Sequence, residues 1–115
     1  MSRHGYYENP KKSAYSIEYY DSSWEYDYMK ELDGDDSVSK WTKNHGIRIK
    51  YFDERNQFKY YNPDFLVERA DGTIELVEMK GEHMLKNPDT KRKKEYAEKW
   101  CEARGMKYRL ISRYQ

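Results

Sequence analysis

Hydrophobic and polar residues alternate through the middle of the chain in a way that predicts β-strands. Residues 47–52 repeat with a period of two, as expected for a half-buried strand. Residues 53–57 have the composition of a turn, and residues 58–61 lead into Pro63, which is tolerated at the entrance of a strand. We therefore expect extended structure on both sides of this turn.

A second extended region surrounds Ala70-Asp71-Gly72. Residues 65–69 and 73–80 flank this turn, and an Asp-Gly pair between apolar runs is a strong signal for a β-hairpin. Gly81 is expected to end the second strand, and residues 108–111 to form a last short strand.

Two helices are predicted around these strands. Ser22 and Glu25 form a capping-box pattern, so we expect a helix to about Leu32. Pro88 opens a second helix, and Gly105 ends it. The apolar positions of the second helix share one face: Tyr96, Ala97, Trp100 and Cys101.

The order of these elements predicts an α/β fold with a central mixed β-sheet flanked by helices. We expect one domain over residues 21–115 and an N-terminal arm over residues 1–20. Alternating residues should order this arm as a short strand against the domain: Tyr15, Ile17 and Tyr19. Val38 and Trp41 are expected to anchor a turn after the first helix.

Composition narrows the class of protein. Hydrophobic and charged residues each make up 37% of the chain, and 13 tyrosines and 3 tryptophans supply much of the area that can be buried. The lone Cys101 excludes an internal disulfide framework and a four-cysteine zinc site. The sequence has no apolar run near the roughly 20 residues that span a bilayer and no secretory signal. We expect a soluble, cytoplasmic protein without a membrane partner.

Charge is distributed unevenly along the chain. Residues 18–36 contain eight acidic residues and one basic residue, whereas residues 86–99 contain six basic and three acidic residues. This separation suits a metal site beside a track for a polyanion, although both segments could equally be solvated faces.

Three charged residues are expected on adjacent apolar strands. Glu78 and Lys80 point to the same side of one strand, and Asp64 begins its hairpin partner. Burying unpaired charges costs several kcal/mol, so their clustering requires a reason, such as a divalent metal that binds a phosphodiester. Asp64, Glu78 and the backbone carbonyl of Met79 are candidate ligands for Mg²⁺ or Mn²⁺. Lys80 could orient a nucleophile or offset charge on the phosphate.

Glu25 is a further candidate ligand. It falls inside the apolar arc of the first helix, where a carboxylate needs a partner: this arc contains Trp24, Tyr28, Met29 and Leu32. The alternative is that Glu25 only caps its own helix through Ser22.

The second helix begins with a run of cations from Lys91 to Lys94. The helix dipole disfavours cations in the first turn, so a docked phosphate would explain them. We expect Lys91, Lys93 and Lys94 to contact DNA, with an ordinary exposed lysine run as the alternative.

These residues together resemble the PD-(D/E)xK nuclease superfamily. The longer pattern is similar to the catalytic domain of TnsA-type transposon endonucleases, and partly to nuclease domains of type III restriction helicases. It consists of Ser22-x-x-Glu25, Leu32-Asp33-x-Asp35, Trp41, Tyr51-Phe52, Tyr61-x-Pro63-Asp64-Phe65-Leu66-Val67 and Val77-Glu78-x-Lys80-Gly81. The resemblance implies a restriction-endonuclease-like core in which Glu25, Asp64, Glu78 and Lys80 bind metal and cut DNA.

The resemblance leads us to expect an Mg²⁺-dependent endodeoxyribonuclease. Because no further partner-binding domain is recognised, we expect a stand-alone enzyme of phage or mobile-element type. Cutting two strands would call for a homodimer or a partner protein. Two alternatives remain: a non-catalytic nucleic-acid-binding domain of the same fold, and an unrelated α/β domain in which Glu78 and Lys80 form a structural ion pair.

Overall fold

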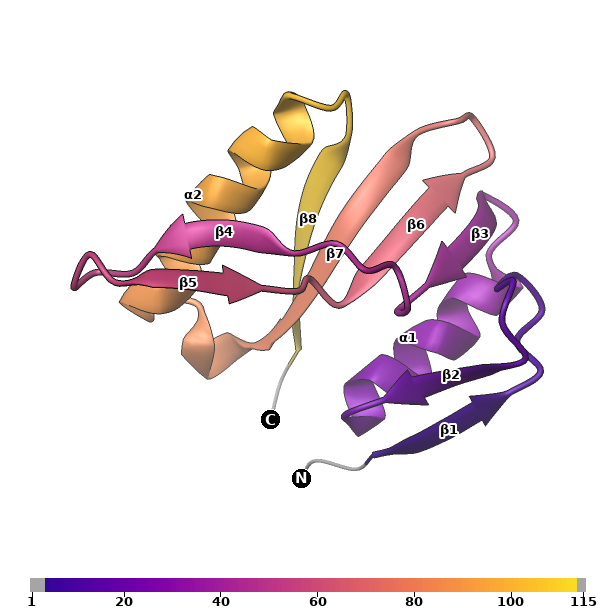
Figure 1. Cartoon of the computed structure of the whole chain (residues 1–115). Coiled ribbons are helices and arrows are strands. Elements are labelled where there is room, and N and C mark those ends of the chain that lie inside the picture. The colour runs from indigo at the N-terminus through magenta and orange to yellow at the C-terminus, as the bar shows by residue number, and fades with distance from the viewer. Residues whose placement is uncertain (1–3, 114–115) are drawn as a thin grey trace.

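A four-stranded mixed β-sheet forms the centre of the structure (Figure 1). The computed structural model describes residues 4–113. The sheet has the order β3-β6-β7-β8: Val38–Thr42, Phe65–Arg69, Ile74–Gly81 and Lys107–Arg113. β3, β6 and β7 pair antiparallel, whereas β8 pairs parallel to β7 after a crossover through helix α2, Pro88–Glu102.

Two separate hairpins and two helices cover this sheet. Helix α1 spans Ser23–Gly34 and follows the hairpin of β1, Gly5–Glu8, and β2, Ile17–Tyr20. The second hairpin joins β4, Ile49–Phe52, to β5, Phe58–Tyr61. A short 3-10 helix, Glu82–Met84, connects β7 to α2.

The sheet has a separate hydrophobic core on each face. On one face, Met29 and Leu32 of α1 pack with Trp41, Phe65 and neighbouring strand residues. On the other, side chains of α2 and of the β4–β5 hairpin pack with Leu76: Ala97, Cys101, Ile49, Tyr51 and Tyr61. The alternation of β6 and β7 directs successive side chains into these two cores.

Local signals in the sequence account for the ends of the main elements. Ser22 accepts a hydrogen bond from the Glu25 N–H at the start of α1, and Asn87 accepts one from the Asp89 N–H at the start of α2. Gly72 adopts a φ of +90° in the turn between β6 and β7, a conformation that glycine reaches without strain. The expected α/β fold with a mixed sheet is confirmed, and it is compatible with a restriction-endonuclease-like fold.

Two local expectations were wrong. Val38 and Trp41 lie in β3 rather than in a turn, because residues 38–42 pair with β6, about thirty residues later. The expected strand around Tyr15, Ile17 and Tyr19 begins only at Ile17 and pairs with an unexpected strand, β1.

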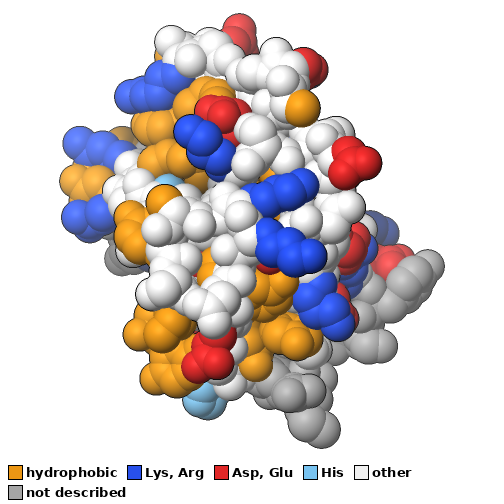
Figure 2. Space-filling view, turned by 90° about the vertical axis from the view of Figure 1, so that its right-hand side faces the viewer, with side chains coloured by type: hydrophobic (Ala, Val, Ile, Leu, Met, Phe, Trp, Pro, Cys, Tyr) orange, Lys and Arg blue, Asp and Glu red, His pale blue; other side chains and the backbone are white. Residues whose placement is uncertain are grey.

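Strand β2 also turns toward the domain the face opposite to the one that the sequence predicted. Tyr15, Ile17 and Tyr19 are exposed, while Glu18 between them is only 1% exposed. Figure 2 shows hydrophobic side chains gathered low on the molecule, level with the β1–β2 hairpin, and Lys and Arg side chains across the middle. Tyr15, Ile17 and Tyr19 therefore do not anchor the segment; the buried carboxylate of Glu18 does, together with Tyr20, which packs against the first core.

Buried carboxylates attach the N-terminal hairpin to β3. Glu18 accepts hydrogen bonds from Ser13 Oγ, Thr42 Oγ1 and the Lys43 N–H. Asp33, at the end of α1, accepts four hydrogen bonds, from Tyr7 Oη, Trp41 Nε1 and the N–H groups of Lys11 and Lys12. Each carboxylate is thus satisfied by donors from several elements, as burial requires.

Neither α1 nor α2 could span a membrane, since no helix among residues 4–113 is both long and apolar enough.

We predict that Asp33→Ala lowers the free energy of unfolding by roughly 2–4 kcal/mol, because it leaves several buried donors without an acceptor. Asp36→Ala, at an exposed position just after α1, should change it by less than about 0.5 kcal/mol. Urea unfolding followed by tryptophan fluorescence measures both. Equal effects of the two substitutions would contradict the anchoring role of Asp33.

Candidate active site

The candidate site lies where the β6–β7 ladder ends. The last pair in this ladder is Phe65 with Val77, and β7 continues to Gly81 without a partner from β6. The Met79 N–H instead donates to Asp64 Oδ2, at 2.8 Å. The N–H and C=O of one strand residue point to the same neighbouring strand, so the Met79 carbonyl faces the same side as Asp64.

Glu78 is a buried carboxyl group whose pKa is strongly raised at this position. It is 6% exposed, and no N–H or O–H group among residues 4–113 donates to its Oε1, so its partner there is the Asp64 carboxylate, which it can meet only when it holds a proton. Lys80 Nζ lies 3.7 Å from Glu78 Oε2. Burial and then the negative charge of Asp64 raise the pKa of Glu78 to about 8, even though Lys80 and Lys93 oppose this shift.

Glu25 of α1 is close enough to Asp64 to be affected by its charge, and its carboxylate already has partners within the protein. Its carboxylate accepts from the Asp21 N–H at 2.8 Å and pairs with Lys43 Nζ. Burial raises the pKa of Glu25 and the charge of Asp64 adds to this, while Lys43 and the Asp21 N–H oppose it. At the start of α1 the Glu25 N–H donates to Ser22 Oγ, while the Glu25 carboxylate binds the Asp21 N–H and Lys43, and its role as a metal or water ligand stays a prediction.

Lys43 is a residue of this site that the sequence reasoning missed. Its ammonium contacts Glu25 and Asp21 and lies 5.7 Å from the centre of the Phe65 ring. Burial lowers the pKa of Lys43, but its hydrogen bonds and ion pairs with these acids outweigh burial and raise it. The only hint in the sequence was the position of Lys43, a cation that directly follows β3.

His45 was also missed, and it fixes the backbone next to Asp64. His45 Nδ1 accepts the Ile47 N–H at 2.9 Å, so the proton lies on Nε2, which donates to the Pro63 carbonyl at 2.6 Å. Burial lowers the pKa of His45, which favours this neutral form.

The three candidate lysines of α2 diverge. Lys93 reaches the candidate site: its Nζ lies 5.3 Å from the centre of the Tyr61 ring, and its charge acts on Glu78. Lys91 and Lys94 instead line a hollow with Leu85, Leu110 and Ser112. Lys91 and Lys94 are three residues apart and so share the face of α2 that lies toward β8.

Tyr61 and Tyr108 close the α2 side of the site. The Tyr61 hydroxyl donates to the Lys93 carbonyl at 3.3 Å. Burial, above all, raises the pKa of both tyrosines, and the charge of Glu78 adds to this. Tyr61 was part of the sequence pattern before Pro63-Asp64, but no role had been assigned to it.

The donor groups at Asp64 fit a hard divalent cation. No three His, Cys, Asp or Glu side chains form a ready-made cluster within residues 4–113. Mg²⁺, however, commonly takes only one or two carboxylates and completes its shell with waters and substrate phosphate. Asp64 and Glu78 would supply the two carboxylates, and the Met79 carbonyl faces the same side as Asp64.

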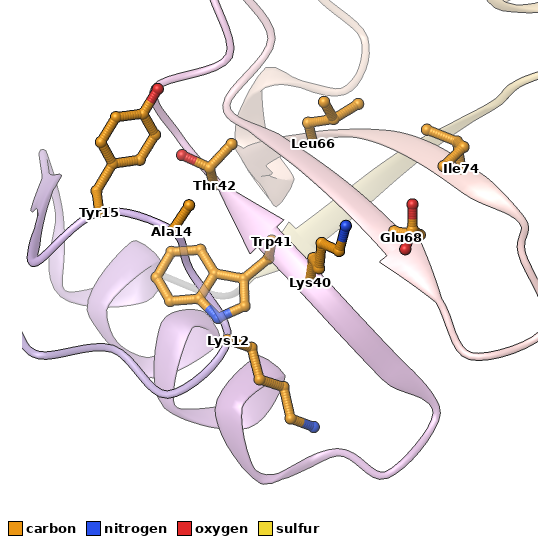
Figure 3. A pocket seen from close by; sticks show the side chains of 9 residues that line it. All are labelled: Lys12, Ala14, Tyr15, Lys40, Trp41, Thr42, Leu66, Glu68 and Ile74. Carbon is orange, nitrogen blue, oxygen red and sulfur yellow. The ribbon is translucent and has the colours of Figure 1, made fainter.

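A well-defined apolar pocket of the molecule is separate from this site. It has a volume of about 180 Å³ and is lined by nine residues, among them Tyr15, Thr42, Leu66 and Ile74 (Figure 3). None of the four candidate catalytic residues lines it. Charge and unsatisfied hydrogen bonding, rather than cavity shape, therefore mark the candidate site.

We predict that Lys43→Met lowers the free energy of unfolding by about 3 kcal/mol, because it leaves Glu25 buried without its cation. Lys40→Met, at an exposed position of β3, serves as the control and should have little effect. The double variant Lys43→Met/Glu25→Gln should regain most of the loss in chemical denaturation. Additive effects of the two substitutions would rule out the pairing.

We also predict that Asp64→Asn raises the melting temperature at neutral pH in chelator, because it removes the charge facing Glu78 and keeps an oxygen for the Met79 N–H. The folded wild type retains a proton on Glu78 that the unfolded chain releases. Its stability should therefore fall as pH rises from the ordinary value of 4.5 to about 8.

Asp64→Asn should flatten this pH dependence, as measured by differential scanning calorimetry across that range. Asp71→Asn, in the exposed β6–β7 turn, is the matched control and should leave the slope unchanged. A lower melting temperature for Asp64→Asn in chelator would contradict the carboxylate repulsion.

Comparison with known proteins places these residues in a family. No curated protein matched the chain. A family model described as "TnsA-like endonuclease N terminal" matches residues 35–113, which include Asp64, Glu78 and Lys80 but not Glu25. The matched region contains the whole central sheet and α2. The chain belongs to the TnsA-like endonuclease N-terminal family.

Proposed function

We propose that the protein is a metal-dependent DNA endonuclease that hydrolyses phosphodiester bonds. The family assignment supports a nuclease-related role. The observation that carries the finer proposal is the interaction of Asp64 with the buried Glu78 carboxylate, next to Lys80, where β7 extends beyond its pairing with β6.

In this proposal, Asp64, Glu78 and the Met79 carbonyl would hold Mg²⁺ or Mn²⁺. A bound divalent ion polarises a phosphate and lowers the pKa of coordinated water. Glu25 would contribute from the other side of Asp64, where Lys43 already balances its charge. We therefore infer that Glu25 positions water or the neighbouring lysine rather than replacing Asp64 or Glu78 as a ligand.

Lys80 would act on the phosphate directly. Its ammonium is 3.7 Å from Glu78 and partly exposed, so it can turn toward a bound substrate while it stays near the carboxylate. Lys80 would stabilise charge that develops on the phosphate oxygens or orient the attacking water. Lys93 adds a second positive charge on the α2 side of the site.

DNA is the proposed partner, held partly by the start of α2. Lys93 would contact the phosphate nearest the site, and Lys91 and Lys94 would contact the backbone farther along, on the side of β8. Cutting both strands would require a second active site, from another copy of the chain or from a partner protein.

We predict that the purified protein cleaves plasmid DNA with Mg²⁺ or Mn²⁺ and that Asp64→Ala and Lys80→Ala each reduce the rate by at least a hundredfold. Lys107→Ala, at an exposed position at the start of β8, is the matched control and should retain activity. Either metal should also raise the melting temperature of the wild type but not that of Asp64→Ala.

Gel assays with supercoiled, linear, branched and single-stranded DNA test this proposal. Survival of all four substrates with both metals would refute the enzymatic function. Binding without cleavage would instead favour the non-catalytic nucleic-acid-binding domain. Cleavage that persists in Asp64→Ala would refute the assigned site.

A further inference from the structure

The outer face of the β4–β5 hairpin carries an alternating set of cations and aromatic rings. Arg48, just before β4, and Lys50 lie over the rings of Tyr60 and Phe58, at 4.2 and 4.3 Å from the ring centres. Phe58 also meets the rings of Phe52 and Tyr60 edge to face, at 5.7 and 5.1 Å. We call these five residues the β4–β5 ribbon face.

This face is exposed despite its aromatic content. Phe52, Phe58 and Tyr60 are 41, 44 and 49% exposed, whereas the inward residues of the hairpin are buried in the second core. The strands Ile49–Phe52 and Phe58–Tyr61 contain no acidic residue, so the face is positive. Exposed rings with cations beside them suit a partner that has both aromatic faces and negative charge.

The ribbon face leads directly into the candidate site. β5 ends at Tyr61, three residues before Asp64. The base of the hairpin is pinned there, because Asn62 Nδ2 donates to the Ile47 carbonyl at 2.8 Å and His45 donates to the Pro63 carbonyl. A strand of nucleic acid along the hairpin would therefore reach Asp64 without leaving the protein surface.

We propose that the ribbon face binds a single-stranded segment of DNA next to the cleavage site. Unpaired bases offer their faces for stacking on aromatic rings and on guanidinium planes, whereas a duplex exposes only base edges. Arg48 and Lys50 would meet the phosphates of the same segment. This inference rests on the proposed function, because it names the form of DNA that the site would receive.

The test measures binding separately from cleavage. Fluorescence anisotropy in chelator compares a labelled single-stranded 20-mer with the matching duplex. Phe58→Ala/Tyr60→Ala should bind the single strand at least tenfold more weakly than the wild type, because stacking on these rings is lost. Arg48→Gln/Lys50→Gln should reduce the slope of log affinity against log salt by about 0.7 for each lost phosphate contact.

A second exposed aromatic pair supplies the matched control. Tyr6 and Tyr19 are 61 and 62% exposed, with ring centres 4.8 Å apart, on the β1–β2 hairpin. Tyr6→Ala/Tyr19→Ala should change affinity by less than twofold. Because all substituted rings are exposed, circular dichroism should show the same fold for each variant.

Three results of the binding assay would overturn the inference: unchanged single-strand affinity in both ribbon variants, an equal loss in the Tyr6/Tyr19 variant, or a loss on duplex alone. A change in molar mass by light scattering without a change in DNA affinity would also overturn it and assign the face to a second copy of the chain. If ribbon variants lose affinity while the wild type cleaves no DNA, the ribbon inference stands and the proposed nuclease function fails.

Discussion

The early end of the β6–β7 ladder is the constraint on which the candidate site depends. Beyond Val77, β7 stays in the sheet through its parallel pairing with β8, but no strand within residues 4–113 pairs with its other edge. Asp64 fills part of this gap by accepting the Met79 N–H. Glu78 lies on this same stretch of β7, where it is buried and no donor among residues 4–113 reaches its Oε1, so a cation would stabilise the carboxylate.

Asp64 joins two halves of the site that have their own counter-charges. On the α1 side, Lys43 neutralises Glu25 inside the protein. On the α2 side, Lys80 and Lys93 only partly offset the burial of Glu78. In the first half a buried ammonium thus contacts its carboxylate directly, whereas in the second the Lys80 ammonium lies 3.7 Å from Glu78, which leaves a greater demand for positive charge there. In the proposed function this imbalance directs the metal and the phosphate to the Glu78 side.

Short-range signals allowed much of the fold to be predicted, whereas long-range pairing was not visible in the sequence. Asp71-Gly72, Ser22 and Pro88 mark a turn and two helix starts through local chemistry. β3 was missed because its sequence has mixed polarity, and the segment is extended only because it pairs with β6. For the site, period-two spacing placed Glu78 and Lys80 together, but contacts between distant segments, such as Lys43 with Glu25, had no local signature.

The buried carboxylates of the N-terminal region have a consequence for how the domain unfolds. The family match begins at residue 35, yet Asp33 accepts from Trp41 and Glu18 accepts from Thr42 and Lys43. The recognisable segment therefore relies on acceptors that lie outside it, as well as on the apolar face of α1. Stabilising contacts thus cross this boundary, and loosening the β1–β2 hairpin would remove Glu18, the acceptor of the N–H of Lys43, whose ammonium pairs with Glu25.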